Sequence, residues 1–217
     1  MRLLLALWAV LLLTGCQSDP LSGKNDPKNP WWSLSFSAPD YMFVWVEYSA
    51  VEDINGKLFL RTGGGSACGD EPGDGTESAR GWRGISSTLK GVVGAGLPTR
   101  IYVRWQSIVE QKTYRGWVDI PQEARDIMRA STERRCAKTP KREANALAML
   151  SIGLAPGGVM QVWVVDSCFN IVKVARAQAE IEPLGPGQGQ MQGRYAYKIS
   201  DKAKRYIEQY GIPYGSW

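Results

Sequence analysis

The sequence has no histidine among its 217 residues. This absence excludes Ser-His-Asp and Cys-His nucleophilic catalysis and every metal site that depends on a histidine ligand. Cysteine is scarce as well, with four residues and no CxxC pair, so a cysteine metal site is not expected. These absences predict a protein that is not an enzyme and that needs neither a metal ion nor a cofactor.

Nucleic-acid and membrane-spanning signals are also missing. The formal net charge is +5, but no block of Lys and Arg is dense enough to indicate nucleic-acid binding. After residue 16, no apolar run approaches the roughly 20 residues that a membrane-spanning helix requires. The Gly-rich stretch from Thr62 to Gly81 lacks the GxxxxGK sequence of a phosphate-binding loop.

The first sixteen residues carry the strongest positive signal. Arg2 precedes an apolar run from Leu3 to Leu13, which is too short to span a bilayer and is typical of a secretory signal peptide. The run leads into Leu13-Thr14-Gly15-Cys16, which resembles the lipobox of bacterial lipoproteins. The resemblance implies that residues 1–15 are removed and that Cys16 is lipidated. The alternative is an ordinary secretory signal in which Cys16 is incidental.

A lipidated Cys16 would anchor the chain to a bilayer, because each buried CH₂ of an acyl chain contributes about 0.8 kcal/mol. Residues 16–30 are polar and rich in Pro, Asn, Asp and Lys, which predicts a tether with a reach of roughly 20 Å. The residue after the cysteine is Gln17 rather than the Asp that retains many lipoproteins in the inner membrane. The resemblance therefore implies an outer-membrane protein whose domain faces the periplasm.

Residues 31–217 are predicted to form a single β-dominated α+β domain, an antiparallel sheet or sandwich with two or three peripheral helices. Turns are predicted at Asn55-Gly56 and at Pro156-Gly157-Gly158. Strands are predicted over 41–48, 57–61, 99–107, 113–120, 159–165, 171–181 and 194–199. Helices are predicted over 121–130 and 200–210, the second capped by Ser200 and stopped by Gly211. Residues 144–155 are ambiguous, because Ala, Leu and Met suit a helix.

The longest irregular stretch of the domain, residues 62–81, is rich in Gly and acidic side chains. Loops of this length are usually functional or disordered. Calcium binding is an alternative, but the acidic residues lack the order of an EF-hand loop, so a mobile loop that touches a partner is preferred. Together with the basic segment 131–142, this loop supplies the candidate partner-binding residues Asp70, Glu71, Asp74, Glu77, Arg134, Arg135 and Lys138.

The remaining cysteines and the tryptophans leave alternatives open. In an oxidising compartment, Cys68, Cys136 and Cys168 allow one disulfide and one free thiol in three pairings, and the sequence does not choose among them. Eight tryptophans follow the signal segment. Most are expected in the core of a sheet fold, and the others at a binding surface.

Three stretches in a fixed order carry a second resemblance. They are Leu97-Pro98 followed by IYVRW, Ser107 through Lys112-Thr113-Tyr114, and the segment from Gly153 to Gly158 followed by VMQVWVV. With the lipobox and the Trp31, Pro39 and Tyr41 opening, they resemble a family of small bacterial lipoproteins that is classed as a domain of unknown function. Some similar lipoproteins are immunity proteins of type VI secretion lipase effectors. The resemblance implies a protein that binds and neutralises a secreted toxic effector.

Two other functions compete with this one. An envelope-maintenance lipoprotein would bind peptidoglycan or another outer-membrane component, and tryptophan-lined grooves suit sugars. A glycoside hydrolase needs only two carboxylates and no histidine, which makes Glu110, Asp119 and Asp166 its candidate residues. Solvated or turn-forming carboxylates are the preferred interpretation of these three residues.

Overall fold

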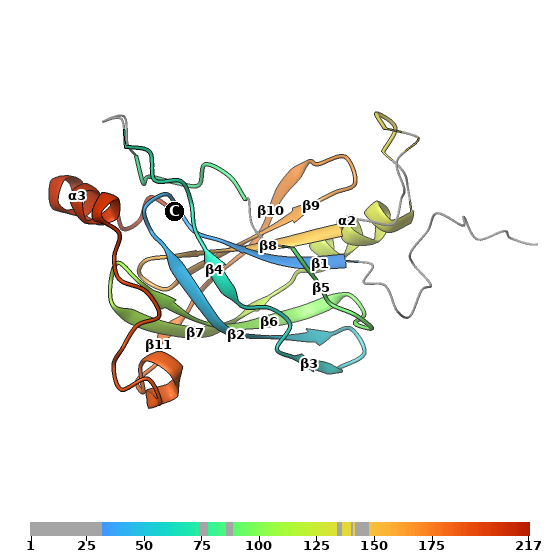
Figure 1. Ribbon diagram of the computed structural model, residues 1–217. Helices are drawn as coiled ribbons and strands as arrows, with labels where there is room; N and C mark the ends of the chain where they lie inside the picture. The colour runs from blue at the N-terminus through green and yellow to red at the C-terminus, as the bar shows by residue number, and fades with distance from the viewer. Residues whose placement is uncertain (1–31, 74–77, 86–88, 134–135, 140, 142–147) are drawn as a thin grey trace, which may run out of the picture.

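Two β-sheets pack face to face as two layers in a computed structural model of the chain (Figure 1). The structure describes residues 32–73, 78–85, 89–133, 136–139, 141 and 148–217. The predicted signal peptide, the tether and Cys16 lie outside the described residues. In the described part, no helix combines the length and the apolar character needed to cross a membrane.

Sheet A has five strands and is mixed. Its order is β10 (Ile171–Gln178), β9 (Val159–Val165), β8 (Ala148–Ala155), β1 (Trp32–Ser37) and β5 (Lys90–Gly91). The strands β8, β9 and β10 form an antiparallel meander, as the sequence predicts for β9 and β10. The turn between β8 and β9 holds Gly157 and Gly158 at φ values of 81° and 79°, where glycine has no steric penalty.

Sheet B contains the two predicted hairpins. Its order is β11 (Glu180–Ile181), β7 (Lys112–Asp119), β6 (Pro98–Ser107), β2 (Val44–Asp53) and β3 (Leu58–Leu60), and β4 (Gly65–Ala67) pairs with the start of β2. The β6–β7 hairpin and the β2–β3 hairpin around Asn55-Gly56 are confirmed. A register shift between Val46 and Tyr48 places a bulge in β2.

The core lies between the sheets and follows from strand alternation. Ile101, Val103 and Trp105 of β6 are 0% exposed, and they share one cluster with Leu150 and Ile152 of β8. Because strand side chains alternate between faces, the intervening residues of β6 point to the outer face of sheet B. The core therefore fixes which side chains sheet B presents to solvent.

The two α-helices of the described residues lie at opposite ends of the sandwich (Figure 1). Helix α2 (Gln122–Glu133) buries Ala124 and Met128 in the main core. Helix α3 (Asp201–Tyr210) starts at Ser200, whose Oγ accepts a hydrogen bond from the Ala203 N–H at 3.0 Å. It ends at Gly211, where φ is +73°. Both predicted helices and the predicted cap are confirmed.

The predicted β-dominated α+β sandwich is confirmed, although it differs from the sequence analysis in detail. Sheet A is mixed rather than antiparallel, since β1 runs parallel to β8, and β1 itself was not predicted. The ambiguous segment is a strand from Ala148, because its side chains are buried on both faces of sheet A. Residues 194–199 are not a strand, and the Ala196 N–H donates to the side chain of Gln106 rather than to the backbone of a strand. The 3-10 helix η3 (Pro186–Gly189) precedes this segment.

One disulfide joins Cys136 to Cys168, which selects one of the three pairings that the sequence allowed. It ties the chain that follows α2 to the turn between β9 and β10. Cys68 has a free thiol and is exposed.

Removal of this disulfide is expected to destabilise the fold measurably. A cross-link with a sequence separation of 32 contributes about 3–4 kcal/mol through the entropy of the unfolded chain. The Cys136→Ala/Cys168→Ala variant should lose about that free energy of unfolding in urea titrations. Cys68→Ala is the matched control and should leave the midpoint almost unchanged, and equal midpoints for the two variants would contradict the prediction.

Candidate interaction surface

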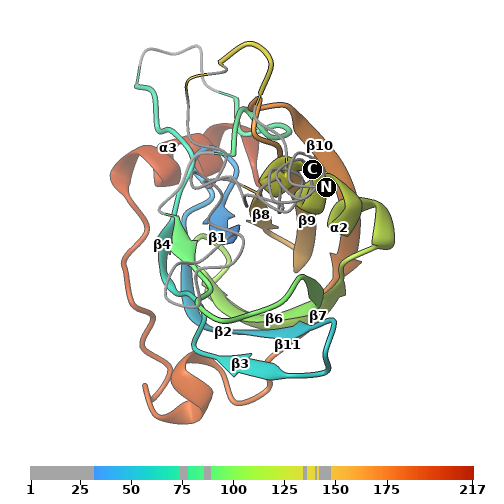
Figure 2. The same ribbon diagram turned by 90° about the vertical axis from the view of Figure 1, so that its right-hand side faces the viewer.

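Neither α-helix lies over the outer face of sheet B, although the 3-10 helix η3 contacts it at Glu47, whose Oε1 accepts the Gly187 N–H at 2.7 Å. In Figure 2, α2 and α3 lie on the side of sheet A, and the lower face of β2, β6 and β7 has no described α-helix beneath it. Apolar and ion-paired side chains of these strands occupy this face.

A row of apolar side chains crosses sheet B, with one residue from each of four neighbouring strands. Leu60 of β3 pairs with Ala50 of β2, Ala50 pairs with Tyr102 of β6, and Tyr102 pairs with Trp117 of β7. Leu60 is 60% exposed and Trp117 is 38% exposed. Directly opposed residues on one face of an antiparallel sheet lie within contact distance, so these four form a continuous strip, here called the apolar row.

Ion-paired residues flank the apolar row on both sides. On one side, Arg100 contacts Glu52 at 2.7 Å. On the other side, Arg104 contacts Glu47 at 2.7 Å, and Arg115 contacts Glu180 at 2.9 Å. Each pair joins neighbouring strands or elements, so the long side chains are held in defined positions beside the apolar row.

The aromatic rings of this face contact one another and the arginines. The ring centroids of Tyr102 and Trp117 are 5.4 Å apart, and those of Tyr48 and Tyr102 are 6.1 Å apart. The guanidinium of Arg100 lies 4.5 Å from the Trp117 ring centroid, a cation–π geometry. Burial raises the pKa of the Tyr102 hydroxyl above its usual value. The rings are therefore fixed before any partner arrives.

A shallow hollow of about 460 Å³ adjoins the Trp117 ring. Tyr102 and Arg115 of the sheet line it together with Gln178 and Glu180. The apolar row therefore ends in a depression with polar walls, which a protruding side chain of a partner can enter.

The acidic candidates are divided between the described and undescribed parts of the chain. Asp74 and Glu77 lie outside the described residues. Glu71 accepts a hydrogen bond from the Ser200 Oγ at 2.8 Å, and the Asp70 N–H donates to Asp40 Oδ1 at 3.0 Å. The Ser200 contact attaches the acidic loop to the start of α3, and the Asp40 contact attaches it to the segment before β2, so the Glu71 carboxylate serves the fold.

Of the three basic candidates, Arg134 and Arg135 are outside the described residues. Lys138 is exposed and follows α2, at the other end of the molecule from α3. Burial alone would raise the pKa of the Asp166 carboxyl, but hydrogen bonds from Asn170 and Cys168 lower it below its usual value. The charge of Lys138 adds to this lowering. Because α2 and α3 occupy opposite ends in Figure 1, the structure does not bring Glu71 and Lys138 together.

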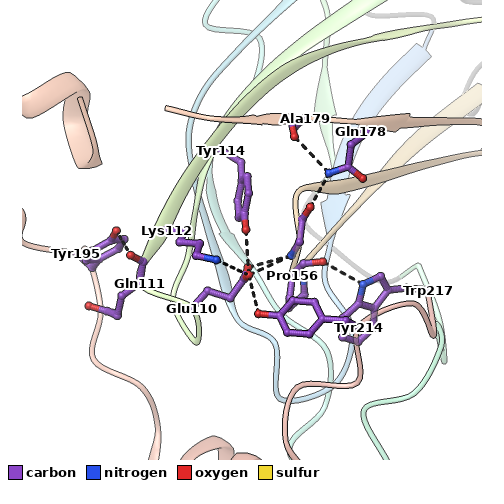
Figure 3. A network of polar contacts seen from close by, with 11 residues as sticks. Glu110, Gln111, Lys112, Tyr114, Pro156, Gln178, Ala179, Tyr195, Tyr214 and Trp217 are labelled. Atoms are coloured by element: carbon purple, nitrogen blue, oxygen red, sulfur yellow. Dashed lines mark hydrogen bonds and ion pairs between the residues drawn. The ribbon is translucent and has the colours of Figure 1, made fainter. Parts of the chain in front are cut away.

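Glu110 is the one candidate catalytic carboxylate with a buried side chain, which is only 1% exposed. Figure 3 shows its oxygens surrounded by donors from separate segments. The hydroxyls of Tyr114 and Tyr214 donate to Oε1 at 2.9 and 3.0 Å, and the Gly157 N–H donates at 3.1 Å to Oε2. Lys112 lies at 3.8 Å and is half exposed. These contacts join the β6–β7 hairpin, the β8–β9 turn and the C-terminal segment.

The other two candidate carboxylates lie elsewhere. Asp119 is at the opposite end of β7 from Glu110, roughly 25 Å away along an eight-residue strand. Asp166 accepts hydrogen bonds from the Cys168 and Asn170 N–H groups at 2.8 Å, which shape the turn after β9. Glycosidase carboxylates lie within about 10 Å of each other, so Glu110 and Asp119 do not form such a pair.

Alkaline pH is expected to weaken the Glu110 contacts. Burial and the neighbouring Glu110 charge raise the pKa of Tyr214 to about 12, and the same two causes raise the pKa of Tyr114. Above about pH 10 the unfolded chain has released protons that the folded chain still holds, so the free energy of unfolding should fall as pH rises. Urea midpoints measured across this range should fall less steeply for Tyr214→Phe than for the parent.

Comparison with known proteins gives one match. Residues 18–215 match a family described as protein of unknown function (DUF2931). The chain belongs to this family. The match covers every described strand and both described α-helices of the DUF2931 domain. No curated protein and no solved structure gives a match to the chain.

Sequence patterns predict only part of the candidate surface of this DUF2931 domain. The alternation in 99–107 already separates Tyr102 and Arg104 from the core residues of β6. Leu60 and Trp117 join Tyr102 through the register of two hairpins, which alternation alone does not specify. Among the described residues, no group of three or more Cys, Asp or Glu side chains is arranged to hold a metal ion.

Proposed function

We propose that this chain is a membrane-anchored binding protein that captures a protein partner with the outer face of sheet B. The observation that supports it is the apolar row, in which exposed Leu60 and Trp117 lie in register between two lines of ion-paired side chains. Protein interfaces combine an apolar centre with a polar rim and are enriched in aromatic residues and arginine.

A protein partner is favoured over a glycan because of the way Trp117 is held. A sugar stacks on a free ring face, whereas one face of Trp117 carries the Arg100 guanidinium and the ring also contacts Tyr102. Trp, Tyr and Arg fixed in this way are the residue types that dominate binding energy between proteins. Envelope maintenance, through peptidoglycan or another outer-membrane component, is the alternative function.

We further propose that the partner is a secreted toxic effector, in agreement with the immunity proteins that the sequence resembles. An inhibitor of this kind blocks an active site or a docking surface of its target and needs no reaction of its own. The Glu110 carboxylate is buried and its oxygens accept hydrogen bonds from three groups of the fold, which supports a structural role for it and an activity of the protein based on binding. The partner would meet this protein in the periplasm, at the outer membrane.

Affinity capture with matched variants tests the proposal. The tagged mature chain is used to capture proteins from envelope extracts of its own organism, in parallel with Trp117→Ala and the control Tyr210→Ala. Tyr210 is an exposed tyrosine of α3, away from sheet B. Recovery of one secreted protein with the parent and the control, but not with Trp117→Ala, is the expected result. Recovery of cell-wall material alone would replace the proposal with the envelope-maintenance alternative.

The proposed anchor gives a separate prediction. Cys16→Ser should abolish incorporation of radiolabelled fatty acid and leave the signal segment uncleaved at that position, because lipidation of the cysteine sulfur precedes cleavage in lipoproteins. Cys68→Ser is the matched control and should be labelled like the parent. Labelling that persists in Cys16→Ser would contradict the assignment.

A further inference from the structure

A cavity of about 380 Å³ opens at the α3 end of the sandwich, and none of its lining residues belongs to the apolar row. This volume lies within the range of pockets that bind small molecules. The wall includes Phe43, Ile108, Val109, Ile199 and Ala203, all of which are apolar.

Four separate segments form the cavity and are fixed to one another. The Ile108 N–H donates to the Phe43 carbonyl at 3.1 Å. The Tyr197 ring contacts Phe43 with centroids 5.0 Å apart, and the Ser200 Oγ donates to Glu71 at 2.8 Å. The cavity wall is therefore held by the fold, and the Ser200 hydroxyl at its rim is satisfied, since it donates to Glu71 and accepts from the Ala203 N–H. A ligand gains little from a hydrogen bond to this hydroxyl and mainly buries hydrocarbon against the apolar wall.

Charge at the rim indicates the other end of the ligand. Lys198 lines the cavity, and the ammonium of nearby Lys202 is 2.9 Å from the Glu71 carbonyl oxygen. Lys198 is the one basic residue of the lining and Glu71 the one acidic residue, and Glu71 already accepts the Ser200 hydroxyl. Lys198 is therefore the lining residue that can pair with an anionic group of a ligand.

We propose that this cavity binds the hydrocarbon chain of a single-chain anionic amphiphile, with Lys198 next to the anionic group. A free fatty acid and a lysophospholipid share this chemistry. Binding at this cavity does not depend on the proposed capture of a protein partner, which uses the apolar row.

The thiol of Cys68, which lines the same cavity, reports its occupancy. All described contacts lie within residues 32–217, so a chain that begins at Gln17 keeps each of them and lacks Cys16. Cys136 and Cys168 are joined, which leaves Cys68 as the free thiol of this chain. The rate at which Cys68 reacts with a chromogenic disulfide is measured without detergent. The added ligands are saturated fatty acids of increasing length and lysophosphatidylglycerol, each at concentrations below micelle formation.

The thiol should react more slowly as occupancy rises, with higher affinity for longer chains until the cavity is filled. Lys198→Glu should weaken binding by roughly two- to fivefold, the size of an exposed ion pair, whereas Lys173→Glu on β10 should not. Ala203→Leu fills part of the cavity and should abolish the protection. Slowing by fatty acids without dependence on chain length, or equal affinities of Lys198→Glu and Lys173→Glu, would overturn the proposal. Protection by only one of the two amphiphiles would support it and identify the source.

Discussion

Trp117→Ala is expected to weaken binding of the captured partner by roughly 30-fold or more, the size of an interface hot spot. The ring is already fixed by Tyr102 and Arg100, so a partner that covers it pays little entropy to order it. Truncation removes the largest apolar group of the row and leaves Arg100 without its stacking partner. Titration calorimetry or surface plasmon resonance with the purified partner measures the effect.

Controls separate loss of contact from loss of fold. Trp117→Phe keeps an aromatic ring and should lose less affinity than Trp117→Ala. Leu60→Ala, at the other end of the apolar row, should also weaken binding, whereas Tyr210→Ala should not. Because Trp117 is a partly exposed residue on the outer face, its replacement should lower the urea midpoint much less than replacement of a core residue such as Trp105. Full affinity in both Trp117→Ala and Leu60→Ala would move the binding site to another face.

Local sequence signals predicted much of the fold. The β6–β7 hairpin and helix α3 depend on alternation, a cap at Ser200 and a stop at Gly211, all within short windows of sequence. The parallel pairing of β1 with β8 joins residues more than a hundred positions apart, and no local pattern encodes it. The same limit applies to the Cys136–Cys168 pairing, for which spacing left three choices open.

The candidate functional residues also divide into those that local sequence identifies and those that depend on long-range pairing. The charge of the acidic loop was visible in the sequence, but the fold uses Glu71 to hold Ser200. The apolar row depends on registers that place Leu60, Ala50, Tyr102 and Trp117 side by side. Charge clusters can be identified from sequence, whereas a surface formed by cross-strand neighbours requires the register of the sheet.

Glu110→Ala is expected to lower the free energy of unfolding by roughly 3–5 kcal/mol, the cost of breaking a buried polar network on one side. Its loss leaves the Gly157 N–H and the buried Tyr114 hydroxyl without their acceptor. Tyr214 is more exposed and can turn to water, so it contributes less. Urea unfolding followed by tryptophan fluorescence measures the change.

Two further variants show whether Glu110 has a structural or a chemical task. Glu110→Gln keeps one carbonyl oxygen, which has two lone pairs for three neutral donors, so its loss of stability should be intermediate. Glu208→Ala removes an exposed carboxylate of α3 and should change the free energy of unfolding by less than about 0.5 kcal/mol. A change that small for Glu110→Ala would contradict the structural role. A buried carboxylate that the fold does not need would then be a candidate for chemistry, and the hydrolase hypothesis would regain its best residue.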